Sequence, residues 1–283
     1  MLGLLPHGTS SAQSRQQLAF GFRHSAGWAL ESLFGSLARF GPTFPRTTVE
    51  AADEYKVPMS VPSAHARAVA VGIDVGGRMK GLHAVALEAG RYRAQRASRD
   101  IGELVHWAVH SQHATVIVID APCGWSTDGR GRPAERALMK ERIWCFSTPR
   151  KETALAHAKG YFNWMLRGME LYDALEQSHP VRDPLKPGRS HFAFETFPHA
   201  ITWHLRGGNA NARRKRTERR ALLDRLGIDH TALTNIDTVD AALCAYTAHL
   251  AATGAALQVF GEEATGLIVP PPLAAPSNRD NPV

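Results

Sequence analysis

Residues 69–77 read VAVGIDVGG, and this stretch decides the class of fold. Its apolar, β-branched residues are typical of a buried strand, and two glycines, Gly76 and Gly77, end that strand just after Asp74 and Val75. Residues 81–90, GLHAVALEAG, predict an antiparallel partner for it. A second apolar run, ATVIVID at residues 114–120, also ends in an aspartate, Asp120. Two buried strands that both deliver an acid to their ends predict a sheet with a chemical site at one edge.

The rest of the chain alternates strand and helix patterns. Because three strands precede the first helix and a buried parallel-type strand follows it, we expect an α/β fold. Its sheet should be mixed, with three antiparallel strands plus parallel strands, and helices should flank it. The further strands are predicted at residues 91–98 and 191–198, and the helices at residues 100–111, 132–144, 159–177, 212–227 and 235–254.

Composition limits the function classes. The chain has 283 residues and a formal net charge of +7, which suits a polyanionic partner such as nucleic acid. No apolar stretch is long enough to cross a bilayer, so no membrane partner is expected. Three widely spaced cysteines in no CxxC pair indicate neither a disulfide framework nor a zinc site. A cytoplasmic protein is the expectation, and no oligomeric state is indicated.

The two ends differ from the middle. Residues 1–64 form an extension without a secretory signal pattern, expected to be disordered or to result from a misassigned start, with translation beginning at Met59. A functional extension, such as an organelle transit peptide, is the alternative. Residues 65–270 are predicted to form one domain, and residues 271–283 a Pro-rich tail.

Five carboxylates are candidates for the chemistry. Asp74 and Asp120 should meet where parallel strands end, Asp237 and Asp240 share a helix face, and Glu195 ends a short strand. Clustered carboxylates repel one another unless a cation neutralises them, and hard oxygen ligands favour Mg²⁺ or Mn²⁺. Two such ions would suit phosphodiester hydrolysis. Taken singly, each aspartate also fits a turn or a helix cap.

Several cations are candidates for binding a phosphate backbone. A solvated surface is the alternative for each of them. They are Lys80 in the turn after the first strand and a basic run on one predicted helix, Arg213, Arg214, Lys215, Arg216, Arg219 and Arg220.

Five ordered motifs carry a family resemblance. GIDVGGRMKGLHAVAL, VIDAPCGW, NWMLRGMELYDAL, FETFPHAI and NIDTVDAALCA together resemble the domain of unknown function 429 family, from about Val69 to Pro270. The resemblance implies a ribonuclease H-like fold and a metal-dependent nuclease acting on DNA or RNA. It implies Asp74, Asp120 and Asp240 as catalytic metal ligands, with Asp237 and Glu195 as possible additions.

Two other functions stay open at this stage. The GIDVGG stretch also resembles the first phosphate loop of sugar kinases and actin-like ATPases, in which glycine amides bind ATP phosphates. That function requires a second glycine-rich loop, which the sequence does not supply convincingly. A non-catalytic nucleic-acid-binding module on the same fold is the second alternative.

Overall fold

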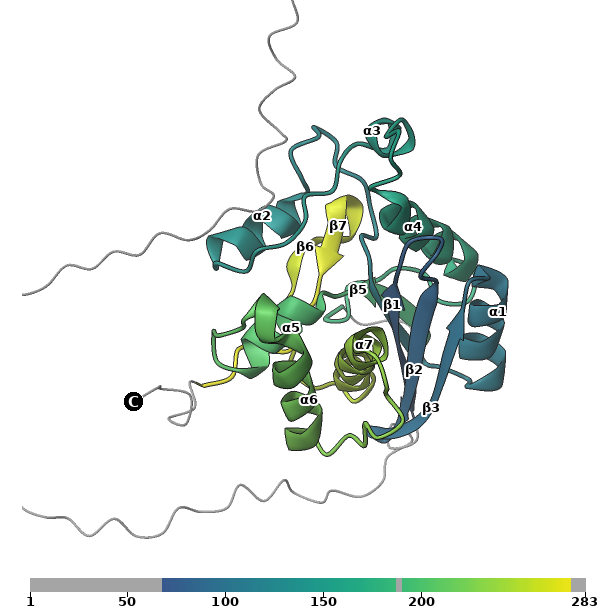
Figure 1. Ribbon diagram of the computed structural model, residues 1–283, viewed down its shortest axis with the longest axis vertical. Coiled ribbons are helices and arrows are strands. Elements are labelled where there is room, and N and C mark those ends of the chain that lie inside the picture. Colours follow the sequence, from purple (N-terminus) through teal and green to yellow (C-terminus); the bar gives the residue numbers. More distant parts are fainter. Residues whose placement is uncertain (1–67, 187–189, 276–283) are drawn as a thin grey trace, which may run out of the picture. The chain divides into compact units, whose positions relative to one another are not determined.

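The computed structural model describes residues 68–186 and 190–275 (Figure 1). A five-stranded sheet in the order β3-β2-β1-β4-β5 forms its centre. β2 pairs antiparallel with both β1 and β3, whereas β1, β4 and β5 run parallel. The predicted mixed α/β sheet is therefore confirmed. Its strands are β1 (Val69–Val75), β2 (Leu82–Glu88), β3 (Arg91–Ser98), β4 (Val116–Asp120) and β5 (Phe192–Glu195).

Helices cover both faces of this sheet. In Figure 1, α1 and α4 lie on one side of the strands, and α7 with α6 lies on the other. A small antiparallel hairpin, β6–β7, stands beside α2. The helices are α1 (Ile101–His106), α2 (Pro133–Lys140), α3 (Lys151–Leu155), α4 (Asn163–Leu175), α5 (Pro198–Leu205), α6 (Lys215–Arg225) and α7 (Ile236–Ala252). The shorter elements are η2 (Trp107–Ser111), η3 (Ala212–Arg214), β6 (Phe260–Glu262), η4 (Glu263–Thr265) and β7 (Gly266–Ile268).

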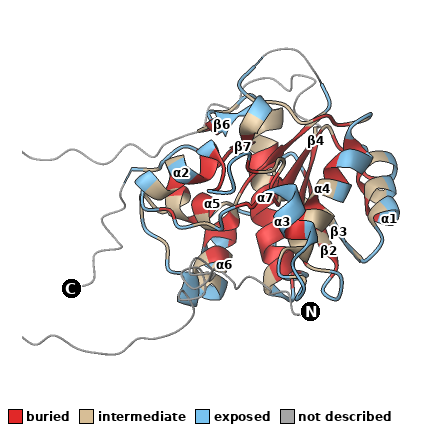
Figure 2. Ribbon diagram, turned by 90° about the horizontal axis from the view of Figure 1, so that it is seen from above, coloured by how far each residue is buried: buried red, intermediate tan, exposed pale blue. Residues whose placement is uncertain are grey.

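Alternation along the strands builds two apolar layers. Val71 and Ile73 of β1 pack with the α1 and α4 side, and Ala70 packs with the α7 side. Because side chains alternate between faces along a strand, the whole length of β1 is buried. Figure 2 shows this core as buried strands and a buried α7 at the centre, with exposed residues toward the outer helices.

Gly72 explains how closely α7 approaches the sheet. A Cβ added at this position would lie 2.1 Å from both the Ala241 carbonyl oxygen and the Ala245 backbone nitrogen. The α7 backbone therefore packs directly on β1. Gly90, at the opposite end of the sheet, faces His249 near the end of α7. α7 thus runs antiparallel to β1, and its first turn lies near the carboxyl end of that strand.

The elements that differ from expectation are short. The predicted helix at residues 100–111 changes to π geometry from Trp107 onward. α3, α5 and the β6–β7 hairpin were not predicted. The proposed extension at residues 1–64 lies outside the described residues, and the tail is described only as far as Ala275. Within the described part, no helix is both long and apolar enough to cross a bilayer.

Candidate functional site

Two aspartates end adjacent parallel strands. Asp74 of β1 pairs in register with Asp120 of β4, so their backbones lie about 4.8 Å apart. Asp74 has the parity of Gly72, and Asp120 has that of Val118, which packs in the α7-side core. Both carboxylates therefore point to the α7 face of the sheet. The convergence that the sequence predicted for these two residues is present.

The start of α7 brings two more acids to the same edge. Asn235 caps the helix by accepting a hydrogen bond from the Thr238 backbone N–H at 2.9 Å. Asp237 and Asp240 follow in the first two turns, and both are buried. A helix N-terminus carries a partial positive charge, which stabilises nearby carboxylates.

Mutual repulsion shows that these acids share one environment. Burial, with repulsion from Asp240 and Asp237, raises the pKa of Asp74 to about 7 against the lowering effect of Lys80 and Lys215. Burial, Asp74 and Asp240 together raise the pKa of Asp120 well above its usual value. Burial also raises the pKa of Asp240. Such upward shifts identify a cluster that favours protons or a bound cation.

Two of the four aspartates, Asp237 and Asp240, form ion pairs with basic side chains. Lys80 Nζ lies 2.5 Å from Asp237 Oδ1, and Arg219 forms an ion pair with Asp240. The Lys80 side chain is 56% exposed, whereas that of Arg219 is 7% exposed. Within residues 68–186 and 190–275, the carboxylates of Asp74 and Asp120 have no hydrogen bond or ion pair with another side chain or backbone group.

The aspartate pair fits a hard divalent cation. In the part of the chain that the structure describes, no three Asp, Glu, His or Cys side chains stand ready to coordinate one ion. Mg²⁺, however, commonly takes only one or two protein carboxylates and completes its shell with water and substrate phosphate. Asp74 and Asp120 supply such a pair, and Asp240 and Asp237 lie within electrostatic reach of it.

Glu195 belongs to a different arrangement. It pairs with Ile119, one residue before Asp120, so strand alternation directs its side chain away from the α7 face. Its two carboxylate oxygens accept hydrogen bonds from Arg132 Nη1 and Nη2 at 2.7 and 2.6 Å. The backbone N–H of Cys123 donates a third at 2.7 Å. These contacts occupy Glu195, and we do not include it among the metal ligands.

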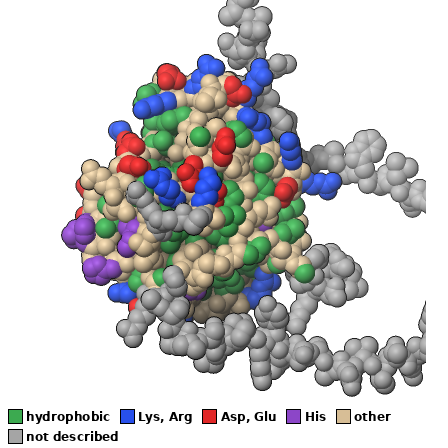
Figure 3. Space-filling model, turned by 180° about the vertical axis from the view of Figure 1, so that it is seen from behind, with side chains coloured by type: hydrophobic (Ala, Val, Ile, Leu, Met, Phe, Trp, Pro, Cys, Tyr) green, Lys and Arg blue, Asp and Glu red, His purple; other side chains and the backbone are tan. Residues whose placement is uncertain are grey.

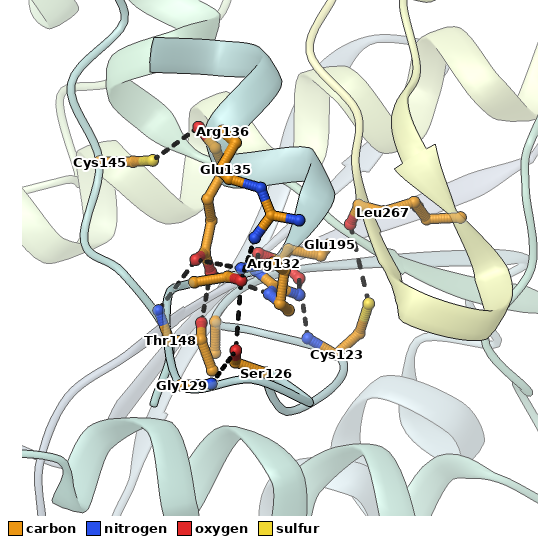
Figure 4. A network of polar contacts seen from close by, with 12 residues as sticks. Cys123, Ser126, Gly129, Arg132, Glu135, Arg136, Cys145, Thr148, Glu195 and Leu267 are labelled. Atoms are coloured by element: carbon orange, nitrogen blue, oxygen red, sulfur yellow. Dashed lines mark hydrogen bonds and ion pairs between the residues drawn. The ribbon is translucent and has the colours of Figure 1, made fainter. Parts of the chain in front are cut away.

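Arg132 is the centre of a buried polar network (Figure 4). Its Nε donates to Glu135 at 2.8 Å, and its guanidinium holds Glu195. The Thr148 backbone N–H also donates to Glu135, at 2.9 Å. Burial disfavours the arginine cation, yet the pairing with Glu195 raises the pKa of Arg132 overall. The network ties α2 and the segment around Thr148 to the end of the sheet.

Sequence reasoning did not single out this network. The available signal was local, since Pro133 and Glu135 are typical of the first turn of a helix. Nothing in the sequence indicates that Arg132 reaches Glu195, which lies 63 positions later. The network was missed because its contacts depend on the tertiary fold.

The structure divides the predicted basic run. Arg219 is buried against Asp240, and Arg220 donates to the Leu233 carbonyl at 2.6 Å. Lys215 is half-buried and close enough to lower the pKa values of Asp74 and Asp240. The remaining members are exposed and free to meet solvent or a ligand, namely Arg213, Arg214 and Arg216.

The glycine loop after β1 satisfies several of its own amides. The backbone N–H of Gly76 donates to the Gly81 carbonyl at 2.9 Å. Those of Lys80 and Gly81 both donate to the Gly77 carbonyl at 3.0 Å. A phosphate loop instead directs its amides outward to the ligand. The loop therefore has the character of a closed turn.

Comparison with known families supplies one match. Residues 72–265 match the family described as "Protein of unknown function (DUF429)". Comparisons with curated proteins and with solved structures gave no match. The family match covers most of the chain and nearly all of the described sheet and helices. The chain therefore belongs to the DUF429 family.

Proposed function

We propose that this protein is a metal-dependent nuclease with a ribonuclease H-like fold, which hydrolyses phosphodiester bonds in DNA or RNA. One observation carries the proposal: Asp74 and Asp120 lie side by side at the carboxyl ends of adjacent parallel strands, face the same side and form no hydrogen bond or ion pair among the described residues. The strand order β3-β2-β1-β4-β5, with its antiparallel half and its parallel half, supports the fold assignment.

The residues of the site would divide the work. Asp74 and Asp120 would hold Mg²⁺ or Mn²⁺, and bound ions of this kind activate water and stabilise the leaving oxygen of a phosphodiester. Asp240, held in its ion pair with buried Arg219, would attract the ion through its charge from beside the pair. Lys80, whose exposed side chain pairs with Asp237, would exchange that carboxylate for a substrate phosphate.

The two alternatives have less support. A kinase-type phosphate loop would need free amides after β1, and three of the amides there bond within the turn. A binding module without catalysis has no need of two adjacent carboxylates, one buried and one half-buried, that form no hydrogen bond or ion pair, because such charges are costly to maintain. The aspartate pair therefore favours catalysis.

The test is the substitution Asp74→Asn, which keeps the size of the side chain and removes its charge. We expect at least a 100-fold loss of Mn²⁺-dependent cleavage of labelled single- and double-stranded DNA and RNA. Mn²⁺ should raise the melting temperature of the wild type, because it binds the folded state. This shift should shrink in the variant, whose metal-free form should melt at the same temperature or higher.

Asp173→Asn is the matched control, because Asp173 is an exposed carboxylate on α4 outside the cluster. It should leave both the cleavage rate and the Mn²⁺ shift unchanged. The nuclease proposal would be wrong if the wild-type protein cut none of the four substrates and Mn²⁺ did not change its melting temperature.

A further inference from the structure

A cavity of about 200 Å³ opens beside Asp120, where all three parallel strands end. Val75 at the end of β1, Pro122 after β4 and Phe197 after β5 contribute to its wall. Phe146 and Trp164 complete the apolar lining. Ligands of open α/β sheets bind at the carboxyl ends of the strands, so this is a favoured place for a substrate group.

The size and charge of the cavity select its occupant. Pockets for drug-sized ligands measure about 300–1,000 Å³, so this one takes a single ring system and not a whole nucleotide. Arg132, the one cation among the lining residues described, already donates hydrogen bonds to two lining carboxylates, Glu195 and Glu135. With that cation occupied and Asp120 at the rim, the cavity disfavours a phosphate. An uncharged, planar group fits best.

Aromatic side chains at the entrance match such a group. Phe146 is 58% exposed, and its ring stands edge-on to Trp164 with a centroid distance of 5.8 Å. The ring centroid of Tyr161, which is also exposed, lies 6.5 Å from that of Phe146. Large exposed aromatic rings beside a polar site are typical of surfaces on which unpaired bases stack.

We propose that this cavity binds one unstacked nucleobase of a single-stranded nucleic acid and so places the neighbouring phosphodiester at the Asp74–Asp120 pair. The inference rests on the proposed nuclease function and specifies its substrate. Asp120 joins the two sites, since it borders the cavity and also faces α7. A base inside a duplex is not available to such a cavity without extrusion, so single strands, loops and bulges are the preferred substrates.

The test compares Phe146→Ala with Trp144→Ala in the full chain. Trp144 is also a highly exposed aromatic residue, two positions away, but it does not line the cavity. The probes are fluorescein-labelled single-stranded DNA and RNA decamers, the same strands as duplexes, and single strands with an abasic site, all with Mn²⁺. Binding is measured by fluorescence anisotropy, and cleavage is measured in parallel.

Phe146→Ala should weaken single-strand binding by about 5- to 100-fold, as the loss of one stacked base does. It should change duplex binding little and leave the salt dependence unaltered, because no phosphate contact is lost. Trp144→Ala should bind as the wild type does. Phe146→Trp should retain affinity, and Phe146→Leu, which keeps apolar volume without a ring, replaces the alanine variant if that protein does not fold.

The outcomes separate this inference from the function on which it rests. Cleavage by the wild type with equal single-strand affinity in Phe146→Ala would reject the base pocket and leave the nuclease standing. Single-strand binding that depends on Phe146 without any cleavage would reject catalysis and leave the pocket standing. Equal losses on single strands and duplexes would also reject the pocket, and a wild type that neither binds nor cuts would reject both.

Discussion

Two groups of buried charged residues near the sheet end are compensated very differently. Arg132 binds both Glu135 and Glu195 through hydrogen bonds of 2.6–2.8 Å. Asp74 and Asp120 have no such partner among the described residues. Since a buried charge without a partner destabilises a fold, buried Asp74 beside half-buried Asp120 favours an external cation or a proton. This contrast is the strongest residue-level sign of a ligand site.

The pH dependence of stability tests this protonation directly. Burial, Asp240 and Asp237 raise the pKa of Asp74 from 3.8 to about 7, while Lys80 and Lys215 oppose the shift. The folded state therefore binds more protons than the unfolded state between these values, and stability falls as pH rises through about 7. We expect the melting temperature in EDTA to decline from about pH 5 to about pH 8.

Asp74→Asn should flatten that decline without abolishing it, because the raised pKa of Asp120 acts in the same direction. Mn²⁺ should also reduce the decline in the wild type, since it replaces the proton as the compensating charge. Parallel curves for wild type and variant would mean that Asp74 does not titrate in this range.

At the scale of elements, the site depends on how α7 packs against β1. The helix backbone lies on Gly72, and this contact brings the first turn of α7 to the carboxyl end of the strand. Small residues on the facing side of the helix, Ala241 and Ala245, allow the close approach. Because Gly72 has no side chain, α7 can pack this closely, and this packing sets the position of Asp240 relative to Asp74.

Gly72→Ala should destabilise the protein by about 3 kcal/mol or more, because the new Cβ meets helix backbone that cannot rotate away. Gly77→Ala is the matched control, since a Cβ there has no heavy atom within 4 Å. It should change the free energy of unfolding by less than about 1 kcal/mol. Urea unfolding measures both, and similar values for the two variants would contradict the close packing.

Local pattern predicted the elements with strong periodicity. The five central strands and the helices α1, α2, α4, α6 and α7 lie where the sequence placed them. The short helices α3 and α5 and the β6–β7 hairpin were not predicted, because elements of three to eight residues show too little hydrophobic periodicity. The Asp74–Asp120 pair was predictable because each residue ends a buried run. The orientation of Glu195 was not, since it depends on the register between β4 and β5.

At the scale of the molecule, a long segment between β4 and α4 forms one wall of the proposed base pocket. It contains α2, α3 and the exposed ring of Phe146, and Arg132 fastens it to β5 through Glu195. The opposite side of the aspartates belongs to α6 and α7, with Lys215 and Arg219. The proposed catalytic pair therefore lies between an aromatic side and a cationic side.

The charged side chains behind the net charge of +7 are arranged differently on different parts of the surface. On the rear face, cationic and acidic side chains are interspersed among apolar ones (Figure 3). Three arginines of η3 and α6 are exposed, namely Arg213, Arg214 and Arg216. They are neighbours in sequence of Lys215, whose charge lowers the pKa of Asp74. If a phosphate backbone crosses the site, this is the charged surface that we expect to contact it.

Arg213→Gln with Arg216→Gln should therefore weaken nucleic-acid binding equally for all sequences. It should reduce the slope of log affinity against log salt by about two units, close to one for each lost contact. Arg91→Gln with Arg142→Gln removes the same net charge from exposed positions outside α6 and should change the slope little. Because long-range attraction depends on total charge and contacts depend on position, only a local interface separates the two variants. Equal slopes for both would assign η3 and α6 to the solvated surface.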